Sequence, residues 1–250
     1  MIALSKGRYR ARAAESAEDL RRAQRLRYLA FSAAGGGADP EGTDSDAFDD
    51  VCTHVLVEEA RGGRLVCCFR ILPLTSGRDI SRSYAAQYYE LSALEGYEGR
   101  LVEMGRFCIH PSVQDPDILR VAWGALTRYV DEAGVDLLFG CASFEGTDAE
   151  RYLDAFAMLK ERHLAPKRWL PRVKAPNVFR FAQRLRLRKP DPREAMLRMP
   201  PLLKSYLLMG GWVSDHAVVD DHMNTLHVFT GLEIGAMPPA RKRLLRAVAG

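Results

Sequence analysis

The chain has 250 residues, 47% of them hydrophobic and 27% charged, and a formal net charge of +4 at pH 7. That length can bury one large core or one and a half smaller ones, so we expect the chain to fold alone. A membrane-spanning helix is excluded, because the best apolar run, Leu202–Val213, is far shorter than about 18 residues and contains Lys204 and two glycines. The segment Met1–Arg8 is too short and polar for a signal peptide, which predicts a cytoplasmic protein.

The N-terminal part begins with an alternating stretch at residues 9–14, which predicts a first strand. A helix is expected from about residue 17 to residue 32, since Ser16 and Asp19 resemble a capping box. In that helix Arg27 falls on the inward, apolar stripe, which is an unusual place for an arginine.

The next segment, residues 33–50, is rich in glycine and then in aspartate, and we expect a loop that is mobile when no ligand is bound. Two strands follow, at about residues 53–59 and 64–72, joined by a hairpin turn at Arg61-Gly62-Gly63. Residues 73–99 are expected to include a short helix.

The middle of the chain alternates strand and helix. We expect strands at about residues 100–110 and 136–142, and helices at about 117–133 and 148–163. Strand, helix, strand and helix in this order make a βαβ unit with parallel pairing.

After residue 166 the chain is rich in proline and basic residues. An apolar helix is expected within residues 199–212, strands at 213–219 and 225–233, and a helical tail at 239–248. We therefore predict a core domain over residues 1–165 and a C-terminal extension, residues 166–250, packed on it.

Charge is unevenly distributed. Between Lys160 and Lys204 fourteen Lys or Arg stand against three acids, a local net charge of +11, which leaves −7 for the rest of the chain. No nucleic-acid-binding motif accompanies this segment. An acidic carrier protein or an anionic membrane surface on the inner membrane face explains it better than nucleic acid.

The five cysteines are an odd number and lack C-x-x-C spacing, so we expect buried free thiols rather than disulfides or a metal site. They are Cys52, Cys67, Cys68, Cys108 and Cys141.

An acid and a base lie three residues apart in the strand at 100–110. In a flat strand Glu103 and Arg106 would point to opposite faces. A glycine inside a strand often marks a bulge, and a bulge at Gly105 would turn both side chains to the same face. We therefore expect Glu103 and Arg106 to share a catalytic site; an ordinary salt bridge on the strand face is the alternative.

Over roughly residues 9–234 the chain resembles the ornithine N-acyltransferases of bacterial ornithine-lipid synthesis, which are related to the acyl-homoserine-lactone autoinducer synthases within the GNAT superfamily. The autoinducer synthases carry a tryptophan shortly after the phenylalanine that corresponds to Phe31. This chain lacks that tryptophan, which favours the ornithine-lipid branch of the resemblance. The residues that match the shared motifs are Arg27, Phe31, Asp46, Asp49, Arg70, Glu103 and Arg106.

The resemblance implies an α/β, GNAT-like fold with a mixed central sheet flanked by helices. It implies transfer of a 3-hydroxyacyl chain from acyl carrier protein, as a 4'-phosphopantetheine thioester, to the α-amine of L-ornithine or a similar amino acid. The product would be lyso-ornithine lipid, and no cofactor would be bound. The donor is expected to be a carrier protein because the segment Pro111–Ile118 has no glycine, and Asp115 and Asp117 would repel the pyrophosphate of coenzyme A.

Roles follow for individual residues. Glu103 would accept the amine proton, directly or through a water. Backbone N–H groups near Phe107 or Cys108 would hold the oxyanion, and Ser143 would line an acyl tunnel. The remaining assignments are the anion anchors Arg27, Arg70 and Arg106, the ornithine-contacting Asp46 and Asp49, and the carrier-docking Arg180, Arg184, Arg186, Arg188 and Lys189.

Two other functions stay open: an autoinducer synthase that uses S-adenosylmethionine, and a non-catalytic protein that binds anionic lipid or nucleic acid. A metal site is not expected, because the spacing of the C-terminal His and Asp residues is loose and favours polar turn residues. Those residues are His216, Asp220, Asp221, His222 and His227. Leu203, Leu207 and Leu208 could touch a bilayer or be buried in the core.

Overall fold

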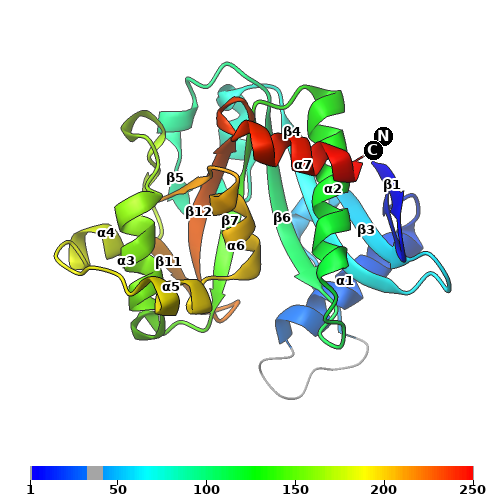
Figure 1. The fold of residues 1–250 in the computed structure, drawn as a ribbon, viewed down its shortest axis with the longest axis horizontal. Helices are drawn as coiled ribbons and strands as arrows, with labels where there is room; N and C mark the ends of the chain where they lie inside the picture. Colours follow the sequence, from blue (N-terminus) through cyan, green and yellow to red (C-terminus); the bar gives the residue numbers. More distant parts are fainter. Residues whose placement is uncertain (1, 33–41, 250) are drawn as a thin grey trace. The chain divides into compact units, whose positions relative to one another are not determined.

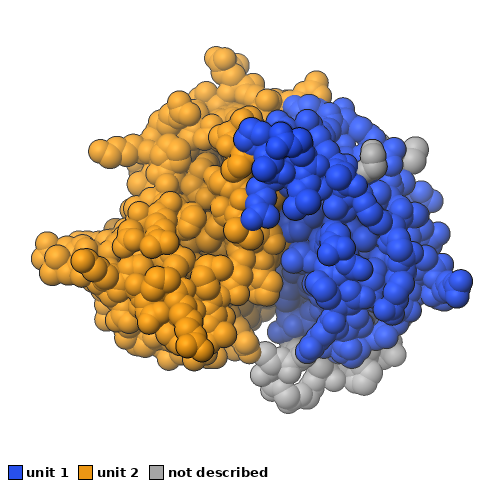
Figure 2. Space-filling model, in the orientation of Figure 1, with its two compact units in different colours: residues 1–73, 104–135, 239–250 blue, residues 74–103, 136–238 orange. Residues whose placement is uncertain are grey.

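The computed structural model describes residues 2–32 and 42–249, and Figure 1 shows its helices and strands. The chain forms two compact units, which Figure 2 colours separately. Unit 1 comprises residues 1–73, 104–135 and 239–250, and unit 2 comprises residues 74–103 and 136–238. None of these boundaries falls at residue 165, and the division there remains a prediction.

The strands of unit 1 lie in the order β1-β2-β3-β4-β6, with antiparallel pairing from β1 to β4. The hairpin between β3 and β4 is confirmed, and Gly62 and Gly63 adopt the left-handed conformation that its turn requires. The strands are β1 (Ala3–Lys6), β2 (Tyr9–Ala13), β3 (Thr53–Glu59), β4 (Leu65–Leu74) and β6 (Leu101–Ile109). Residues 101–103 of β6 and the last residue of β4 belong to unit 2.

Three helices belong to unit 1: α1 (Ala17–Ser32), α2 (Pro116–Ala133) and α7 (Pro239–Ala249). The capping box before α1 is confirmed, since the hydroxyl of Ser16 accepts a hydrogen bond from the Asp19 N–H at 3.1 Å. Helix α2 packs against β1, β2 and α7. The first strand and the last helix are also joined, because Lys6 Nζ donates to the Ala247 carbonyl at 2.9 Å.

Glu58 on β3 is buried and accepts hydrogen bonds from three arginines of unit 1, Arg10, Arg12 and Arg22, at 2.8–3.0 Å. Burial opposes the ionised form, but the hydrogen bonds from the arginines outweigh it and lower the pKa of Glu58 to about 2. The ionised carboxylate of Glu58 on β3 therefore binds arginines of both β2 and α1 and holds these elements together.

We expect Glu58→Gln to lower the free energy of unfolding at neutral pH by roughly 3 kcal/mol, the linkage value for a pKa lowered from 4.5 to about 2. The difference should be complete above pH 4.5 and shrink as the pH falls towards 2, where wild-type Glu58 is protonated as well. Urea unfolding at neutral pH and near pH 3 measures it. Glu59→Gln, at the neighbouring half-buried position, serves as control. An equal loss at both pH values would contradict the prediction.

The strands of unit 2 lie in the order β7-β12-β11-β9, and β10 also pairs with β12. Every residue of β7 pairs antiparallel with a residue of β12. The strands are β7 (Leu137–Glu145), β9 (Val178–Phe179), β10 (Trp212–Val213), β11 (Ala217–Asp220) and β12 (Thr225–Glu233). A separate pair consists of β5 (Tyr89–Glu90) and β8 (Arg172–Val173).

The start of β7 lies beside the start of β6. The carbonyl of Arg100 accepts backbone hydrogen bonds from Asp136 at 2.8 Å and from Leu137 at 3.1 Å. This is the arrangement that parallel strands joined by a helix require.

The α-helices of unit 2 are α3 (Leu153–Arg162), α4 (Phe181–Arg184), α5 (Pro192–Arg198) and α6 (Pro201–Leu208). Short 3-10 helices complete the two units: η2 (Ala47–Asp50), η3 (Gly77–Arg82), η4 (Ala85–Gln87), η5 (Ser92–Leu94), η6 (Ala149–Tyr152), η7 (Lys167–Trp169) and η8 (Ile234–Ala236).

The apolar helix expected within residues 199–212 is confirmed as Pro201–Leu208, and it ends just before Gly210, whose φ is +90°. Two other expectations for the second half of the chain need correction. The expected strand at 213–219 is interrupted at Ser214, whose hydroxyl accepts from the Phe229 N–H and donates to the His216 carbonyl. The expected helix at 148–163 begins as the 3-10 turn η6.

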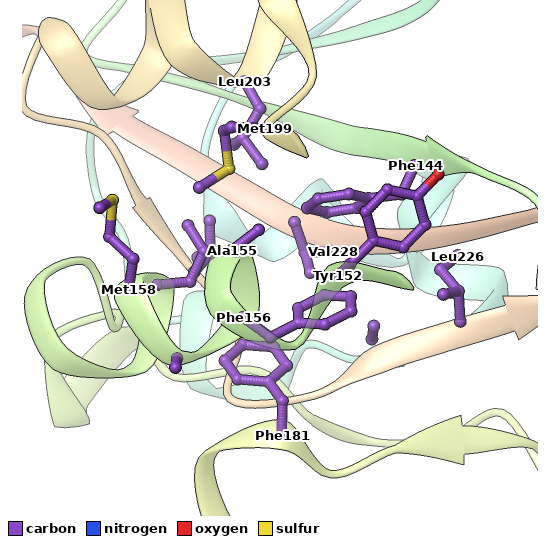
Figure 3. Close-up of a cluster of buried hydrophobic side chains, with 14 of the residues drawn as sticks. Phe144, Tyr152, Ala155, Phe156, Met158, Phe181, Met199, Leu203, Leu226 and Val228 are labelled. Carbon is purple, nitrogen blue, oxygen red and sulfur yellow. The ribbon is translucent and has the colours of Figure 1, made fainter. Parts of the chain in front are cut away.

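The β7–β12 ribbon has two different faces. One face carries Phe144 and Val228, which join the core around Phe156 of α3 and Phe181 (Figure 3). Since side chains alternate along a strand, the opposite face carries the residues between them. That face includes the cross-strand pairs Cys141 with Phe229 and Ser143 with His227.

Candidate active site

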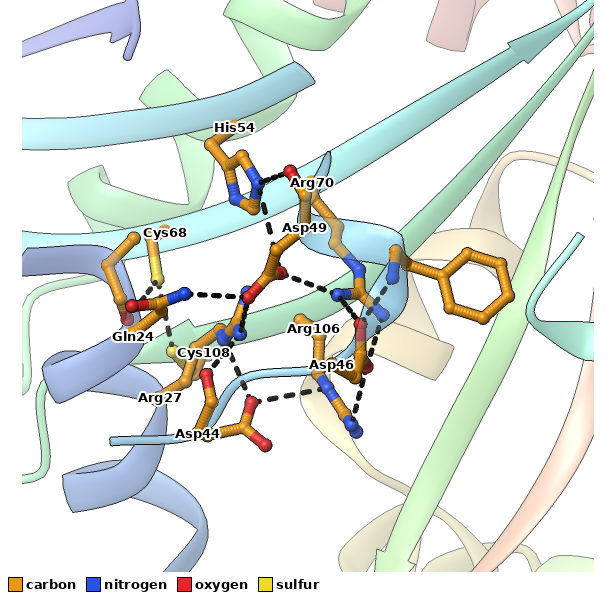
Figure 4. A network of polar contacts seen from close by, with 12 residues as sticks. Gln24, Arg27, Asp44, Asp46, Asp49, His54, Cys68, Arg70, Arg106 and Cys108 are labelled. Atoms are coloured by element: carbon orange, nitrogen blue, oxygen red, sulfur yellow. Dashed lines mark hydrogen bonds and ion pairs between the residues drawn. The ribbon is translucent and has the colours of Figure 1, made fainter. Parts of the chain in front are cut away.

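A buried ion pair lies at the centre of a polar network in unit 1 (Figure 4). Arg27 of α1 is 1% exposed, and its two terminal nitrogens donate to the two oxygens of Asp49 at 2.7 and 2.8 Å. Asp49 also accepts from Gln24 Nε2 at 2.9 Å. Burial opposes ionisation of Asp49, but the Arg27 hydrogen bonds hold its pKa well below the usual range. The unusual inward position of Arg27 is explained by this partner.

Two further arginines complete the network. Arg70 of β4 binds both oxygens of Asp46 at 2.6 and 2.8 Å, and also reaches Asp49 at 2.8 Å. Arg106 of β6 contacts Asp44 at 3.2 Å and Asp46 at 3.1 Å. Asp46 caps η2 by accepting from the Phe48 N–H at 2.9 Å. The network therefore ties the segment at residues 44–50 to α1, β4 and β6.

Within this network three guanidinium groups face three carboxylates, so their charges balance. The sequence assigned Arg27, Arg70 and Arg106 to substrate anions, and in the structure all three contact aspartates. Asp44 was not among the assigned residues, although it lies in the same acidic motif. The members partly open to solvent are Asp46, whose side chain is 24% exposed, Asp44, at 17%, and Arg106, at 13%.

The other assigned residues of unit 1 surround the network. The Arg106 guanidinium lies 5.9 Å from the ring centroid of Phe31, a cation–π contact. Phe107 stacks on Phe69 with centroids 5.7 Å apart. The sulfur of Cys108 lies 3.5 Å from that of Cys68. All five cysteines are free thiols; three are buried, whereas Cys52 and Cys141 are partly exposed.

The irregularity in β6 lies at Arg106 rather than at Gly105. Arg106 has a φ of +52°, a conformation that few non-glycine residues adopt. Gly105 itself does not have a positive φ, and a Cβ there would meet Arg70 Nε only at 3.8 Å, an ordinary contact. The strain is therefore carried by the residue whose side chain contacts the acidic segment.

Glu103 lies in unit 2 and is 4% exposed. One carboxylate oxygen accepts from the Tyr84 N–H and the other from the Ala85 N–H, both at 2.7 Å. The side chain of Glu103 is thus buried and fixed in orientation.

Two histidines of unit 2 are not the polar turn residues that were expected. His216 is 0% and His227 is 3% exposed, and Asp220 is also buried, whereas Asp221 and His222 are exposed. Burial lowers the pKa of His227 to about 4. His227 pairs with the exposed Ser143 on the sheet face opposite the α3 core, and the rings of Tyr88 and Tyr89 lie against its imidazole.

The same face is lined by tyrosines that the sequence did not single out. Tyr89 is buried, and its ring centroid lies 5.2 Å from that of His216 and 5.6 Å from that of His227. Tyr206 of α6 is also buried, and burial together with nearby Cys141 and Glu103 raises the pKa of its hydroxyl. Cys141, Glu103 and Tyr206 therefore lie near one another.

The basic residues assigned to carrier docking fall into two groups. Arg180, Arg184, Arg186 and Lys189 are exposed. Arg188 is exposed as well, but it donates to the Asp154 carboxylate at 2.9 and 3.3 Å, whereas Arg184 lies 3.9 Å from the exposed Glu150. Lys160 also stabilises the segment at residues 185–188, because its Nζ atom donates hydrogen bonds to the carbonyls of Leu185 and Arg188 at 2.9 Å each.

Among residues 2–32 and 42–249, the structure has no helix long and apolar enough to cross a membrane. Of the leucines expected near a bilayer, Leu203 is buried and Leu208 is exposed. The described part of the chain also contains no group of three or more His, Cys, Asp or Glu side chains that could hold a metal ion.

Comparison with known proteins agrees with this arrangement. Residues 26–124 match the acetyltransferase (GNAT) domain family. The L-ornithine N(alpha)-acyltransferase of Rhodobacter capsulatus is 34% identical over 239 residues, which cover 92% of this chain and 91% of the relative. The enzyme of the same name from Rhizobium meliloti is 28% identical over 90% of this chain and 79% of its own length.

A solved structure gives the fold independently. An N-acyl amino acid synthase from uncultured soil microbes aligns over 98% of each chain with a TM-score of 0.50 at 12% identity. The predicted GNAT-like fold is confirmed, and so is the acyltransferase activity class. With a relative that is 34% identical along almost its whole length, the chain belongs to the family of L-ornithine N(alpha)-acyltransferases.

Proposed function

We propose that this acyltransferase moves a 3-hydroxyacyl chain from acyl carrier protein to the α-amine of L-ornithine and so forms lyso-ornithine lipid. The names of the relatives from Rhodobacter capsulatus and Rhizobium meliloti support ornithine as the acceptor. The exposed basic side chains between Arg180 and Lys189 support an acidic carrier protein as the donor.

Glu103 carries the mechanistic part of the proposal. In the reaction, the amine nitrogen attacks the thioester carbonyl, a C–N bond forms, the C–S bond breaks and the thiolate takes up a proton. The amine must first lose a proton, and Glu103 is a buried carboxylate oriented by two backbone N–H groups. We assign it as the acceptor of that proton, directly or through a water.

The unit 1 network has a second role in this proposal. The buried pair of Arg27 and Asp49 would hold the acidic segment in place, and Asp46 and Arg106, which are less buried than that pair, would contact substrate. Arg106 would anchor a substrate anion and Asp46 the side-chain ammonium of ornithine. Ser143 is exposed on β7 and would line the acyl chain.

The proposal is tested by incubating the purified protein with 3-hydroxyacyl carrier protein and L-ornithine, and by identifying the product by mass spectrometry. An N-acylated ornithine with free thiol released in equal amount is the expected result. In a parallel reaction S-adenosylmethionine replaces ornithine. Formation of an acyl-homoserine lactone there, without acylation of ornithine, would assign the chain to autoinducer synthesis instead.

The carrier-docking assignment predicts a defect that depends on the donor. Changing Arg184 and Arg186 together to glutamate should raise the KM for acyl carrier protein by about tenfold or more and leave turnover at saturation nearly intact, because charges at the rim of an interface govern association. Arg188 is left unchanged because it binds Asp154 within the fold. Kinetics with acyl carrier protein and with a short acyl-pantetheine measure the effect.

A matched control changes the exposed Arg241 and Arg243 of α7 to glutamate, which alters net charge by the same amount outside the basic segment. This control should retain the wild-type KM for acyl carrier protein. Equal losses with carrier protein and with pantetheine would show that Arg184 and Arg186 support the fold or the pocket rather than docking.

A further inference from the structure

We propose that His227 binds the hydroxyl group of the acyl chain through its Nε2 atom and thereby selects hydroxylated donors. This inference rests on the proposed function and assigns a specificity role within it. The residues that carry it are His227 of β12 and Tyr89 of β5, both in unit 2.

Tyr89 fixes which nitrogen of His227 carries the proton. The Tyr89 hydroxyl lies 2.8 Å from the His227 carbonyl oxygen and 3.2 Å from His227 Nδ1. A carbonyl oxygen can only accept, so the tyrosine proton goes to it. The Nδ1 atom must then be the donor to the tyrosine oxygen, which leaves Nε2 of the neutral ring as a bare acceptor.

The bare Nε2 atom of His227 is buried and has no hydrogen-bond partner among the described residues. An unpaired buried acceptor costs about 1–3 kcal/mol, so a donor brought by a ligand is favoured there. His216 Nε2 is likewise buried and has no hydrogen-bond partner among the described residues, and its Nδ1 lies 2.7 Å from the Asp215 carboxylate. His227 differs from His216 because it pairs with Ser143, which is proposed to line the acyl chain.

The surroundings favour a neutral hydroxyl over an ammonium group as the donor. The ring centroid of His227 lies 5.0 Å from that of Tyr88 and 5.6 Å from that of Tyr89. The ring centroid of Phe229 lies 5.7 Å from that of Tyr89. An ammonium group pays a large desolvation penalty in such an aromatic setting, and the nearby Asp220 carboxylate already accepts a hydrogen bond from the Met223 N–H at 3.0 Å. A hydroxyl on an otherwise apolar chain matches one neutral acceptor among aromatic rings.

The position of His227 also suits the acyl chain. His227 pairs directly with Ser143 across the β7–β12 ribbon, so both side chains belong to one face. The next pair on that face is Cys141 with Phe229. The small residues of β7 thus lie beside the imidazole, on the face opposite the core of α3.

The test compares two acyl-pantetheine donors of equal chain length, one with and one without the 3-hydroxyl, in the acylation of L-ornithine. Wild-type protein should prefer the hydroxylated donor in kcat/KM, and His227→Phe should reduce that preference about tenfold or more, the value of one lost hydrogen bond at a buried site. The preference is a ratio measured on one enzyme preparation, so a loss of folded protein cancels out.

Two variants keep the proposal falsifiable. Tyr89→Phe removes the hydroxyl that sets the His227 tautomer and should also weaken the preference, whereas His222→Phe, at an exposed turn position, should leave it unchanged. An unchanged preference in His227→Phe, or a change only in the KM for ornithine, would overturn the assignment. If the wild-type protein acylates no ornithine with either donor, the proposed function itself fails.

Discussion

Replacing Glu103 with glutamine is expected to lower turnover by roughly 100-fold or more, because the group that accepts the amine proton is lost while its volume is kept. The effect should appear in kcat, since neither substrate needs the negative charge for binding in the proposed mechanism. Steady-state kinetics with 3-hydroxyacyl carrier protein and L-ornithine measure it. Near-native turnover would remove Glu103 from the mechanism.

The structure adds a complication to this variant. Both oxygens of Glu103 accept backbone N–H groups, from Tyr84 and Ala85, and the NH₂ group of a glutamine would face one of them. An unpaired buried donor costs about 1–3 kcal/mol, so the melting temperature must be measured beside the rate. Glu145→Gln, at an exposed position of β7, is the control and should change neither.

The second large effect concerns stability. Asp49→Asn should lower the free energy of unfolding by about 3–5 kcal/mol, because it leaves Arg27, Arg70 and Arg106 with only Asp44 and Asp46 as acidic partners, so one positive charge of the network is uncompensated. For a protein of this size the melting temperature should fall by on the order of 10 °C. Thermal unfolding followed by circular dichroism measures the loss.

The neighbouring Asp50 provides a control, since it lies in the same 3-10 helix but is exposed. Asp50→Asn should change stability by no more than about 0.5 kcal/mol. The pKa of Asp49 is lowered in the fold, so the difference in the free energy of unfolding between wild type and Asp49→Asn should be complete at neutral pH. This difference should shrink at acid pH, where the carboxylate of wild-type Asp49 becomes protonated. A difference in the free energy of unfolding that does not change with pH would contradict the assignment of the loss to the charge of Asp49.

Local patterns predicted most of the elements. The helix at 17–32 and the strand at 53–59 have the expected bounds, because capping residues and hydrophobic periodicity are local signals. The partner of a strand is not a local property. The strand at 225–233 was assigned to an extension, yet it pairs along its full length with β7, about 80 residues earlier. That pairing places His227 beside Ser143, and Tyr88 and Tyr89 lie against its ring, so the role of this residue could not be derived from spacing.

The unit 1 network shows the same limit for charges. Arg27 was singled out as an unusual inward arginine and Arg70 and Asp49 as motif residues, and each was assigned a substrate group as its partner. The structure pairs them with one another. A sequence shows that a buried charge needs a partner, whereas only the fold shows which partner it has. The choice of Gly105 over Arg106 as the irregular residue failed for a related reason, since the strain lies at a side chain held by the network.

The division of unit 1 into three chain segments has a consequence for its synthesis on the ribosome. The segments at residues 1–73 and 104–135 emerge early, but α7, which packs on α2 and accepts a hydrogen bond from Lys6, emerges only after all of unit 2. Domains generally fold in the order in which they are translated. Here the unit that begins first is completed last, so the nascent chain exposes the face of α2 that α7 later covers, and that interval is when chaperone binding or aggregation would occur.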